Sequence, residues 1–204
     1  MFLRIRVDNY LCYMYKEYSP CSVLAPFIYH FWEYKGETRS GLKFNIPPHG
    51  CSDFVFIVGN AADCIRDSLI MKPYHSYFFG PMNTFTELVA HTNFIHIIGV
   101  RFRPCGLFQF IEIPLNELAN QGIDSQEFPV LFSQSFIYQL CESNQNPIDI
   151  IEHELVRQVY KNNMDTEKQI SYAVSLISRQ KGIVSIKELA TEACLCLRQF
   201  ERKF

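Results

Sequence analysis

The sequence lacks several of the patterns by which membrane proteins and common enzyme classes are recognised. No apolar run approaches the roughly 20 residues that a transmembrane helix needs. Arg4, Arg6 and Asp8 interrupt the N-terminal stretch before it reaches the length of a signal peptide. A phosphate-binding P-loop, a dinucleotide-binding glycine pattern and a G-x-S-x-G serine motif are all absent. We therefore expect a cytoplasmic protein that does not bind to membranes and is not an enzyme.

Metal-binding patterns are lacking too. The eight cysteines form no C-x-x-C pair, and no pair of histidines lies near them at the spacing of a zinc site. His91 and His96 are not accompanied by an H-x-H motif or by a third ligand at a typical spacing. We therefore expect reduced thiols, no metal and no other cofactor.

Strong net charge is also missing, because the formal charge is -2 at pH 7. The whole chain therefore has no general attraction to nucleic acid. The charge is nevertheless uneven. Residues 165–204 contain seven Lys/Arg and five Asp/Glu and have a net charge of +2, whereas residues 1–164 have twelve and sixteen and a net charge of -4. This is the sign expected of an acidic body with a more basic C-terminal part.

Residues 20–113 have the composition and the spacing of β structure. The stretch Phe27–Tyr34 is rich in aromatic residues, and Ser52–Asn60 is a short apolar run that ends in a Gly-Asn turn signal. Phe85–Pro104 is typical of two strands joined by a turn at Thr92-Asn93. Several short strands at this spacing, with prolines between them, predict a β-sandwich or an open barrel.

After Pro114 the pattern becomes helical. We expect helices within residues 115–121, 130–143, 146–162 and 165–182. The third has an apolar stripe, and Asn146 is placed to cap it. That stripe consists of Ile148, Ile151, Leu155 and Val159.

The sequence thus predicts an α+β protein in three parts. Residues 1–113 are expected to form a β-rich sensory or effector domain, and residues 114–164 a helical connector. Residues 165–204 are expected to form a separate all-α part. The boundary near residue 164 is placed in a polar stretch between two periodic helices.

The last twenty residues have the outline of a helix-turn-helix. Ser185 and Glu188 form an S-x-x-E capping box at the start of a short helix. Two groups of small or apolar side chains are expected to face the core, and Arg198, Gln199 and Arg202 are expected to point away from it. An ordinary αα-hairpin would have the same periodicity. The core-facing groups are Ile186, Leu189, Ala190 and Ala193 before the turn at Cys194–Cys196, and Leu197, Phe200 and Phe204 after it.

The stretch SIKELATEACLCLRQFERKF resembles the first helix-turn-helix of the AraC-type transcription regulators. Cys194 stands where that family usually has glycine, and Cys196 where it usually has serine. A left-handed backbone at Cys194 would cost roughly 1 kcal/mol. The matching residues are Leu189-Ala190, Leu195, Arg198-Gln199-Phe200, Arg202 and Phe204.

Two upstream stretches are similar to the sensory half of one branch of the same family. They are IPPHGCSDFVFIVG and GVRFRPCGLFQFIEIPLNELANQ, in which His49 replaces the usual Asp and Cys105 a usual Gly. The resemblance implies a cupin-like β-sandwich or barrel with appended helices.

The resemblance also implies a function, namely that of a bacterial one-component regulator. Arg198, Gln199 and Arg202 would contact bases or phosphates, and Lys203 would contact a phosphate. DNA, an unknown small-molecule effector and a second copy of the chain are the implied partners. Since the family has two helix-turn-helix units and only the first is recognisable here, we expect the chain to be a fragment of a longer regulator.

Four residues are candidates for a ligand site in the β domain, each with a simpler alternative. Trp32 could line an apolar pocket or only fill the core, and His49 could face a ligand or lie in a solvated turn. Arg101 and Arg103 could clamp an anion or be solvated at a sheet edge. The alternative function is a cupin-like small-molecule-binding module or enzyme with a helical tail, which would require a metal or a catalytic pair.

Overall fold

The computed structural model divides the chain into two compact units, residues 1–161 and residues 162–204. The division lies close to the predicted boundary at residue 164. The residues that the structure describes are 13–37, 41–58, 64–66, 69–90, 92–111, 113, 115, 117–127, 131–161 and 168–204. The predicted turn at Gly59-Asn60 lies outside them.

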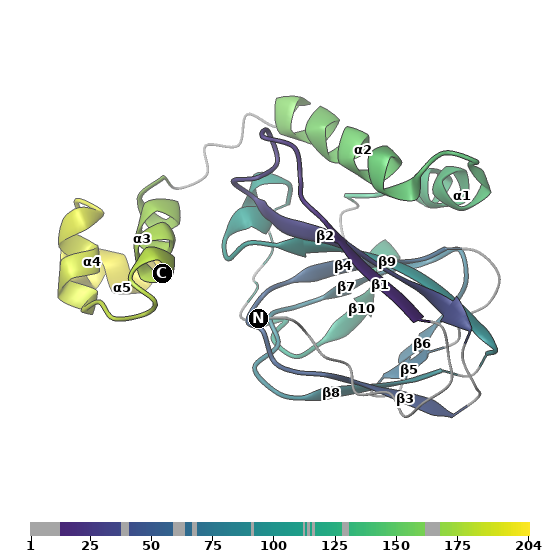
Figure 1. Cartoon of the computed structure of the whole chain (residues 1–204). Coiled ribbons are helices and arrows are strands. Elements are labelled where there is room, and N and C mark those ends of the chain that lie inside the picture. The colour runs from purple at the N-terminus through teal and green to yellow at the C-terminus, as the bar shows by residue number, and fades with distance from the viewer. Residues whose placement is uncertain are drawn as a thin grey trace. The chain divides into compact units, whose positions relative to one another are not determined.

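The larger sheet of the first unit has six antiparallel strands in the order β1-β2-β9-β4-β7-β10 (Figure 1). The longest strands, β2 and β9, are direct neighbours, and their register places Trp32 opposite Gly99. β9 is therefore a central strand, with β2 on one side and β4 on the other. The strands are β1 Tyr13–Tyr18, β2 Ile28–Glu37, β4 Asp53–Ile57, β7 Ser76–Phe79, β9 Phe94–Phe102 and β10 Gly122–Asp124.

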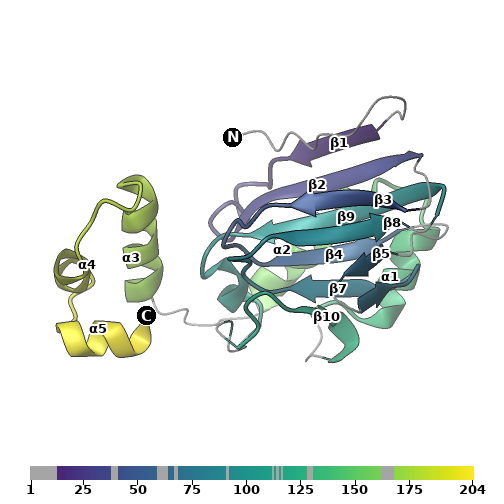
Figure 2. The ribbon, with the colours of Figure 1, turned by 90° about the horizontal axis from the view of Figure 1, so that it is seen from below.

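A smaller antiparallel sheet faces the larger one. Its four strands lie in the order β3-β8-β5-β6. Seen from below, β3, β8 and β5 lie in front of the larger sheet, and the helices α1 and α2 lie behind it (Figure 2). These strands are β3 Leu42–Ile46, β5 Cys64–Arg66, β6 Leu69–Met71 and β8 Thr86–Ala90.

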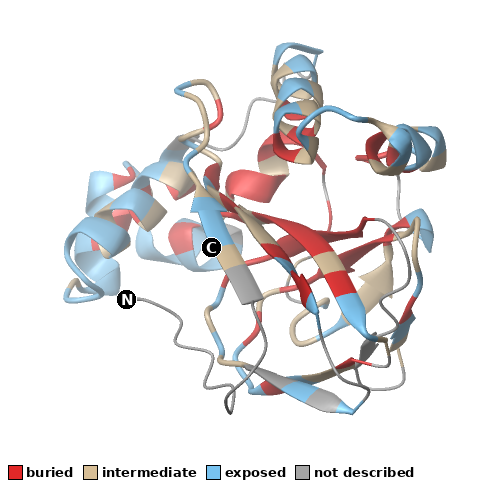
Figure 3. Ribbon diagram, turned by 45° about the vertical axis from the view of Figure 1, so that its right-hand side comes forward, coloured by how far each residue is buried: buried red, intermediate tan, exposed pale blue. Residues whose placement is uncertain are grey.

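Helices α1 (Gln134–Glu142) and α2 (Pro147–Lys161) cover the other face of the larger sheet, so the unit has three layers and two cores. The central strands are largely buried (Figure 3). The core under the helices includes Phe31, Phe54, Phe56, Phe132, Ile151 and Leu155. The core between the sheets includes Val55, Ile57, Met71, Tyr77, Ala90 and Ile97.

All of β4 is buried because both of its faces are covered. Phe54 and Phe56 point to the helices and lie edge-on to Phe132, with ring centroids 5.4 and 4.9 Å apart. Val55 and Ile57 belong to the core between the sheets. The strand therefore reads as a continuous apolar run in the sequence, as predicted for Ser52–Asn60.

Helix α2 packs through the stripe that the sequence predicts. Ile148, Ile151 and Leu155 are buried, and the Asn146 side chain accepts a hydrogen bond from the Ile148 N–H at 3.1 Å. The Glu152 carboxylate accepts a hydrogen bond from the Cys21 N–H at 2.7 Å. This bond ties the segment after β1 to the helix layer.

The second unit contains α3 (Lys168–Arg179), α4 (Ile186–Glu192) and α5 (Leu197–Lys203). Gly182, with φ of 80°, follows α3 as expected of a helix-ending glycine. The predicted capping box of α4 is confirmed, because Ser185 and Glu188 exchange both of its hydrogen bonds. Buried residues of all three helices include Ile170, Ala173, Leu189 and Phe200.

Two expectations for the middle of the chain differ from the structure. The described residues within 115–121 form turns, and α1 and α2 belong to the first unit. The turns are held by backbone bonds to the end of β7, because Gly80 N–H donates to Gln121 O at 3.0 Å and Asn120 N–H to Pro81 O at 3.0 Å. These tertiary bonds replace the helical bonds that the local pattern favours. Two 3-10 helices, η1 (Gly106–Gln109) and η2 (Ser125–Glu127), complete the unit.

Among the described residues, no helix combines the length and the apolar character that crossing a membrane requires.

Candidate functional site

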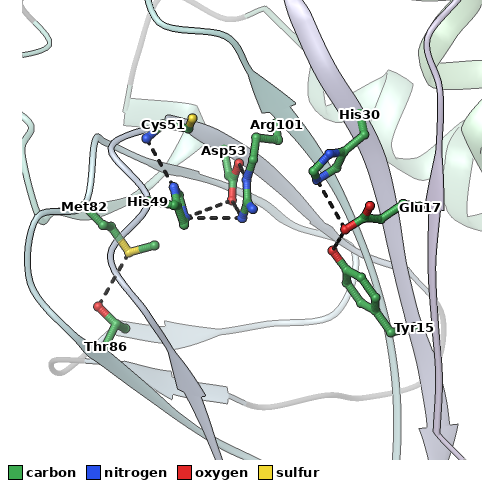
Figure 4. A network of polar contacts seen from close by, with 9 residues as sticks. All are labelled: Tyr15, Glu17, His30, His49, Cys51, Asp53, Met82, Thr86 and Arg101. Atoms are coloured by element: carbon green, nitrogen blue, oxygen red, sulfur yellow. Dashed lines mark hydrogen bonds and ion pairs between the residues drawn. The ribbon is translucent and has the colours of Figure 1, made fainter. Parts of the chain in front are cut away.

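Polar side chains gather on the face of the larger sheet that looks toward the smaller sheet. Alternation along each strand puts Arg101 and Asp53 on the same face as the core residues Ile97 and Val55. Figure 4 shows these polar side chains other than Trp32. The interior polar cluster comprises Tyr15, Glu17, His30, Trp32, His49, Asp53 and Arg101.

An ion pair between Arg101 and Asp53 lies at the centre of this cluster. The two residues are register partners on β9 and β4. Arg101 donates from Nε to Asp53 Oδ1 at 2.9 Å and from Nη2 to Oδ2 at 2.7 Å. The Arg101 side chain is 18% exposed and the Asp53 side chain 6%. The geometry is the planar, two-bond pairing in which arginine and carboxylate interact most strongly.

His49 reaches this ion pair from the loop between β3 and β4. Its Nε2 lies 3.2 Å from Arg101 Nη2 and 3.7 Å from Asp53 Oδ2. Its Nδ1 accepts a hydrogen bond from the Cys51 N–H at 3.2 Å, which fixes the ring against its own loop. Burial, together with the Asp53 charge, raises the pKa of the Cys51 thiol, so this cysteine stays protonated.

A second group of polar side chains lies beside this pair, on β1 and β2 (Figure 4). The Tyr15 hydroxyl donates to Glu17 Oε1 at 2.9 Å, and His30 Nε2 lies 3.9 Å from the same oxygen. Burial, then the bond to Glu17, raises the pKa of Tyr15, which therefore remains a neutral donor. Burial lowers the pKa of His30 and outweighs the opposing effect of Glu17, so the ring is neutral at pH 7.

Trp32 lies flat across β9. A Cβ atom at Gly99 would be only 1.9 Å from the indole ring, so the absence of a side chain at Gly99 is what makes room for it. The indole Nε1 and the imidazole Nε2 of His30 are both shielded from solvent. Neither atom has a hydrogen-bond partner among the residues that the structure describes. Buried polar atoms are usually paired, so these two atoms are exceptions within the described part of the chain.

Three of the four predicted ligand candidates are brought together here. Trp32, His49 and Arg101 lie on or against the same sheet face. Arg101 is on a central strand, so the edge interpretation is wrong for it, and His49 is not in a solvated turn, because its side chain is 15% exposed. Arg103 lies apart, after the end of β9. It donates from Nε to Ala25 O at 2.8 Å and stacks on Tyr29, with Cζ 4.4 Å from the ring centroid.

The sequence analysis did not identify Tyr15, Glu17, His30 or Asp53 as parts of a site. A local signal existed for His30. It lies two residues before Trp32 in a predicted aromatic strand, where a polar residue is unusual. No local signal links Asp53 to Arg101, because their proximity depends on the order of strands in the sheet.

A histidine–carboxylate pair lies near the β1 edge, away from this cluster. His96 Nε2 is 2.8 Å from Glu33 Oε1, and the Tyr18 hydroxyl donates to Glu33 Oε2 at 2.8 Å. Burial and this bond raise the pKa of Tyr18 to about 12. His91 lies outside the described residues, and within the described part of the chain no group of three potential ligands could hold a metal ion.

In the second unit, the candidate DNA-contacting residues lie on the outer side of α5. Arg198, Gln199 and Arg202 are exposed, whereas Phe200 is 2% exposed. Gln199 Oε1 also accepts a hydrogen bond from the Cys196 N–H at 3.3 Å, so this side chain helps to cap its own helix. Lys203 belongs to α5, but its side chain lies outside the described residues.

The turn between α4 and α5 has a left-handed residue, Cys194, with φ of 55°. The Leu195 N–H donates to Ala190 O at 2.9 Å and closes the turn. Three of the residues expected to face the core are exposed instead, because each lies at the first position of a helix or directly after its end. These are Ile186 at 55%, Leu197 at 38% and Phe204 at 61% exposed.

Comparison with known proteins gives a family match and structural similarities, among them the two that follow. A family described as "Domain of unknown function (DUF6597)" matches residues 16–124. A cupin 2 conserved barrel domain protein from Salinispora arenicola CNS-205 is similar with 16% identity and a TM-score of 0.34, covering 52% of this chain and 87% of that one. The AraC-like transcriptional activator CuxR is similar with 11% identity and a TM-score of 0.37, covering 92% of this chain and 86% of that one. No curated protein matches the sequence.

Proposed function

The chain belongs to the DUF6597 family, whose description assigns no activity, and we propose that it acts as a transcription regulator rather than an enzyme. In this proposal the second unit binds DNA through α5. The first unit senses a small molecule or joins two copies of the chain. The resemblance of residues 185–204 to an AraC-type helix-turn-helix supports the assignment of the second unit.

One observation supports this proposal most directly, namely the division of α5 into a buried and a basic side. Phe200 anchors the helix in the unit, and Arg198 and Arg202 lie four residues apart on the exposed surface. Residues four apart lie on the same face of a helix, so both guanidinium groups can approach one duplex. Arginine is the side chain that pairs best with guanine edges and with phosphates.

The turn geometry supports the same role. The tight bend at Cys194 sets α5 at an angle to α4, and the capping box fixes where α4 begins. In a helix-turn-helix the first helix crosses the backbone while the second lies in the major groove. α5 has the exposed donors for this, and α4 contributes Lys187 and Thr191 as exposed polar residues.

Sensing would be coupled to DNA binding by a population shift. A ligand in the first unit would have to favour one arrangement of the two units over another, because a ligand with equal affinity for both arrangements changes nothing. The interior polar cluster is the part of the first unit in which buried polar atoms lack partners among the described residues.

The test is binding of the 204-residue chain to a fluorescent duplex of random sequence, measured by anisotropy at several low salt concentrations. We expect weak binding, with Kd of about 10⁻⁴ to 10⁻⁶ M, because nonspecific contacts with phosphates dominate. The double variant Arg198→Ala/Arg202→Ala should bind at least about ten times more weakly and show a smaller salt dependence.

The matched control is Lys43→Ala/Lys72→Ala, which removes two exposed positive charges from the first unit. This control should keep the affinity of the unmodified chain. Equal losses in both double variants would show attraction by net charge alone, and that result would overturn the proposed role of α5. Undetectable binding by the unmodified chain at the lowest salt concentration would overturn it as well.

A further inference from the structure

We propose that Cys194 and Cys196 form a two-thiolate site for a soft monovalent metal ion of the Cu(I) class, in the turn between α4 and α5. The site is inferred from the two thiols and from the turn that carries them, and it does not depend on the proposed function. Only its effect on DNA binding rests on the proposed role of α5.

Accessibility separates these two thiols from the other cysteines. Cys194 and Cys196 are exposed, whereas the other free cysteines that the structure describes are buried or half-buried. Leu195 lies partly buried between them, and its N–H donates to Ala190 O at 2.9 Å. Because this bond holds the intervening residue inward, both thiols lie on the solvent side of the same turn, where a dissolved ion reaches them first.

The two cysteines also lower the stability of the turn without filling a core. Cys194 has φ of 55°, a conformation that glycine adopts without strain. Cys196 is the N-cap residue of α5, where a serine hydroxyl is preferred and a thiol is only a weak acceptor. Packing explains neither residue, because both side chains are exposed. Residues that break local rules without a structural gain are typical of functional sites, and here two of them share one turn.

The spacing of the pair allows one ion to bind both sulfurs. Residues two positions apart have their Cα atoms at most about 7 Å apart. A metal ion with a bond of about 2.3 Å to each thiolate spans up to about 4.6 Å between the sulfurs. Rotation about χ1 brings two side chains on the same side of a turn to such a separation. Cys194 and Cys196 can therefore chelate one ion while the turn stays folded.

The donor set selects the class of metal. Structural zinc sites use four protein ligands, and the described part of the chain contains no group of even three potential ligands. Magnesium and calcium prefer oxygen ligands. Cu(I) is soft, prefers thiolates and is stable with two ligands in a linear arrangement. The pair therefore fits Cu(I) better than it fits a divalent ion.

Binding would change the charge beside the DNA-contacting side of α5. Each thiol releases its proton when its sulfur binds the ion. Two neutral thiols and Cu⁺ thus give an S–Cu–S unit with one net negative charge, and two protons go to solvent. Arg198 lies two residues after Cys196, in the first turn of α5. A negative charge there opposes the attraction of this arginine to phosphates, so Cu(I) should weaken DNA binding.

The experiment is an anaerobic titration of the 204-residue chain with Cu(I), in competition with the coloured chelator bicinchoninate. The variant Cys194→Gly/Cys196→Ser introduces residues that suit the turn, so it should fold at least as well as the unmodified chain. We expect this variant to take up one equivalent of Cu(I) less. The matched control Cys105→Gly/Cys141→Ser also removes two thiols, one of them from a left-handed residue with φ of 63°, and should keep that equivalent.

Single variants test whether both sulfurs bind the same ion. Cys194→Gly and Cys196→Ser should each weaken Cu(I) binding by roughly 10² or more, because the loss of one donor removes the gain from chelation. A single variant with the affinity of the unmodified chain would overturn the proposal, since one exposed thiol would then bind the ion adventitiously. Equal uptake by the unmodified chain and the double variant would overturn it too. Zn(II) bound as tightly as Cu(I) would overturn the assigned class of metal.

The effect on DNA is measured separately, by the anisotropy of the fluorescent duplex. One equivalent of Cu(I) should weaken binding of the unmodified chain at least about threefold at low salt, and it should leave Cys194→Gly/Cys196→Ser unchanged. Uptake of Cu(I) without this effect would leave the metal site intact and remove its action on α5. Uptake of Cu(I) by a chain that does not bind DNA would remove the proposed function and leave the site.

Discussion

At position 194 a cysteine occupies a backbone conformation that favours glycine. Its φ is 55°, in the left-handed region where a Cβ atom meets the following carbonyl oxygen. The AraC-type pattern has glycine at the matching position, and the structure gives the physical reason. The turn geometry is retained in this chain, and the cysteine imposes a cost on the stability of the second unit.

Replacing Cys194 with glycine should therefore stabilise the second unit. We expect the free energy of unfolding to rise by roughly 0.5 kcal/mol, because the added entropy of the unfolded chain offsets part of the relieved left-handed strain of about 1 kcal/mol. Urea unfolding followed by circular dichroism measures the change. Cys196→Gly is the matched control, because its φ of -72° gives glycine no advantage, and it should lower stability. A gain of equal size in both variants would contradict the explanation.

His30 gives a prediction about pH. Burial lowers the pKa of His30 below the value of about 6.5 that it has in the unfolded chain. The unfolded state then binds the proton more readily, so stability is highest above pH 6.5 and is lost as the pH falls below it. Urea midpoints on either side of about pH 6.5 should differ in the unmodified chain and differ less in His30→Leu.

The control for this pH effect is His153→Leu, which removes an exposed histidine from α2. This variant should retain the full difference between the two urea midpoints. The role of His30 would be excluded if His30→Leu kept that difference and His153→Leu removed it. Since His30→Leu also removes a polar atom without a described partner, its stability above pH 6.5 should equal or exceed that of the unmodified chain.

At the scale of elements, the interior face of the larger sheet depends on the pairing of β4 with β9. Asp53 and Arg101 hold these strands together across directly opposed positions. Asp53→Asn would leave a largely buried guanidinium without its carboxylate. We expect a loss of about 3 kcal/mol in the free energy of unfolding, measured by urea unfolding with Trp32 emission as the signal.

The exposed pair between Lys43 and Glu87, at 2.9 Å, provides the comparison. Glu87→Gln should cost less than about 1 kcal/mol, because solvent screens such pairs. Removing both partners at the buried site, in Asp53→Asn/Arg101→Met, should recover part of the loss. A double variant less stable than Asp53→Asn alone would show that the arginine has a role beyond its pairing with Asp53.

Much of the element content was predictable because it is local. Three such patterns depend only on residues that are close together in the chain. They are the aromatic run Phe27–Tyr34, the continuous apolar run of β4, and the cap and apolar stripe of α2. The order of strands was not predictable from such patterns. It places β9 in the centre of the sheet and turns Arg101 from an expected edge residue into a buried partner of Asp53. The turns at residues 115–121 were not predictable for the same reason. Hydrogen bonds to the backbone near Gly80, which is distant in the sequence, replace the expected helix.

At the scale of the whole molecule, each of the two units contains its own buried residues. The first unit has two cores on either side of a six-stranded sheet, whereas the second depends on a few residues of three short helices. A unit this small buries a low fraction of its surface and is marginally stable. A chain built in this way can lose the order of its helical unit while its β unit remains folded.

Phe200→Ala tests this independence. Removal of a buried phenylalanine costs about 3 kcal/mol or more, which approaches the whole stability expected for so small a unit. The helical signal in circular dichroism should decrease, whereas urea unfolding followed by Trp32 emission, which reports on the first unit alone, should keep its midpoint. Phe204→Ala removes a ring that is 61% exposed and should leave both signals unchanged. If Phe200→Ala lowered both the helical signal and the urea midpoint measured by Trp32 emission, the two units would unfold together. In that case a ligand in the first unit would act on α5 through shared stability and not by favouring one arrangement of the units over another.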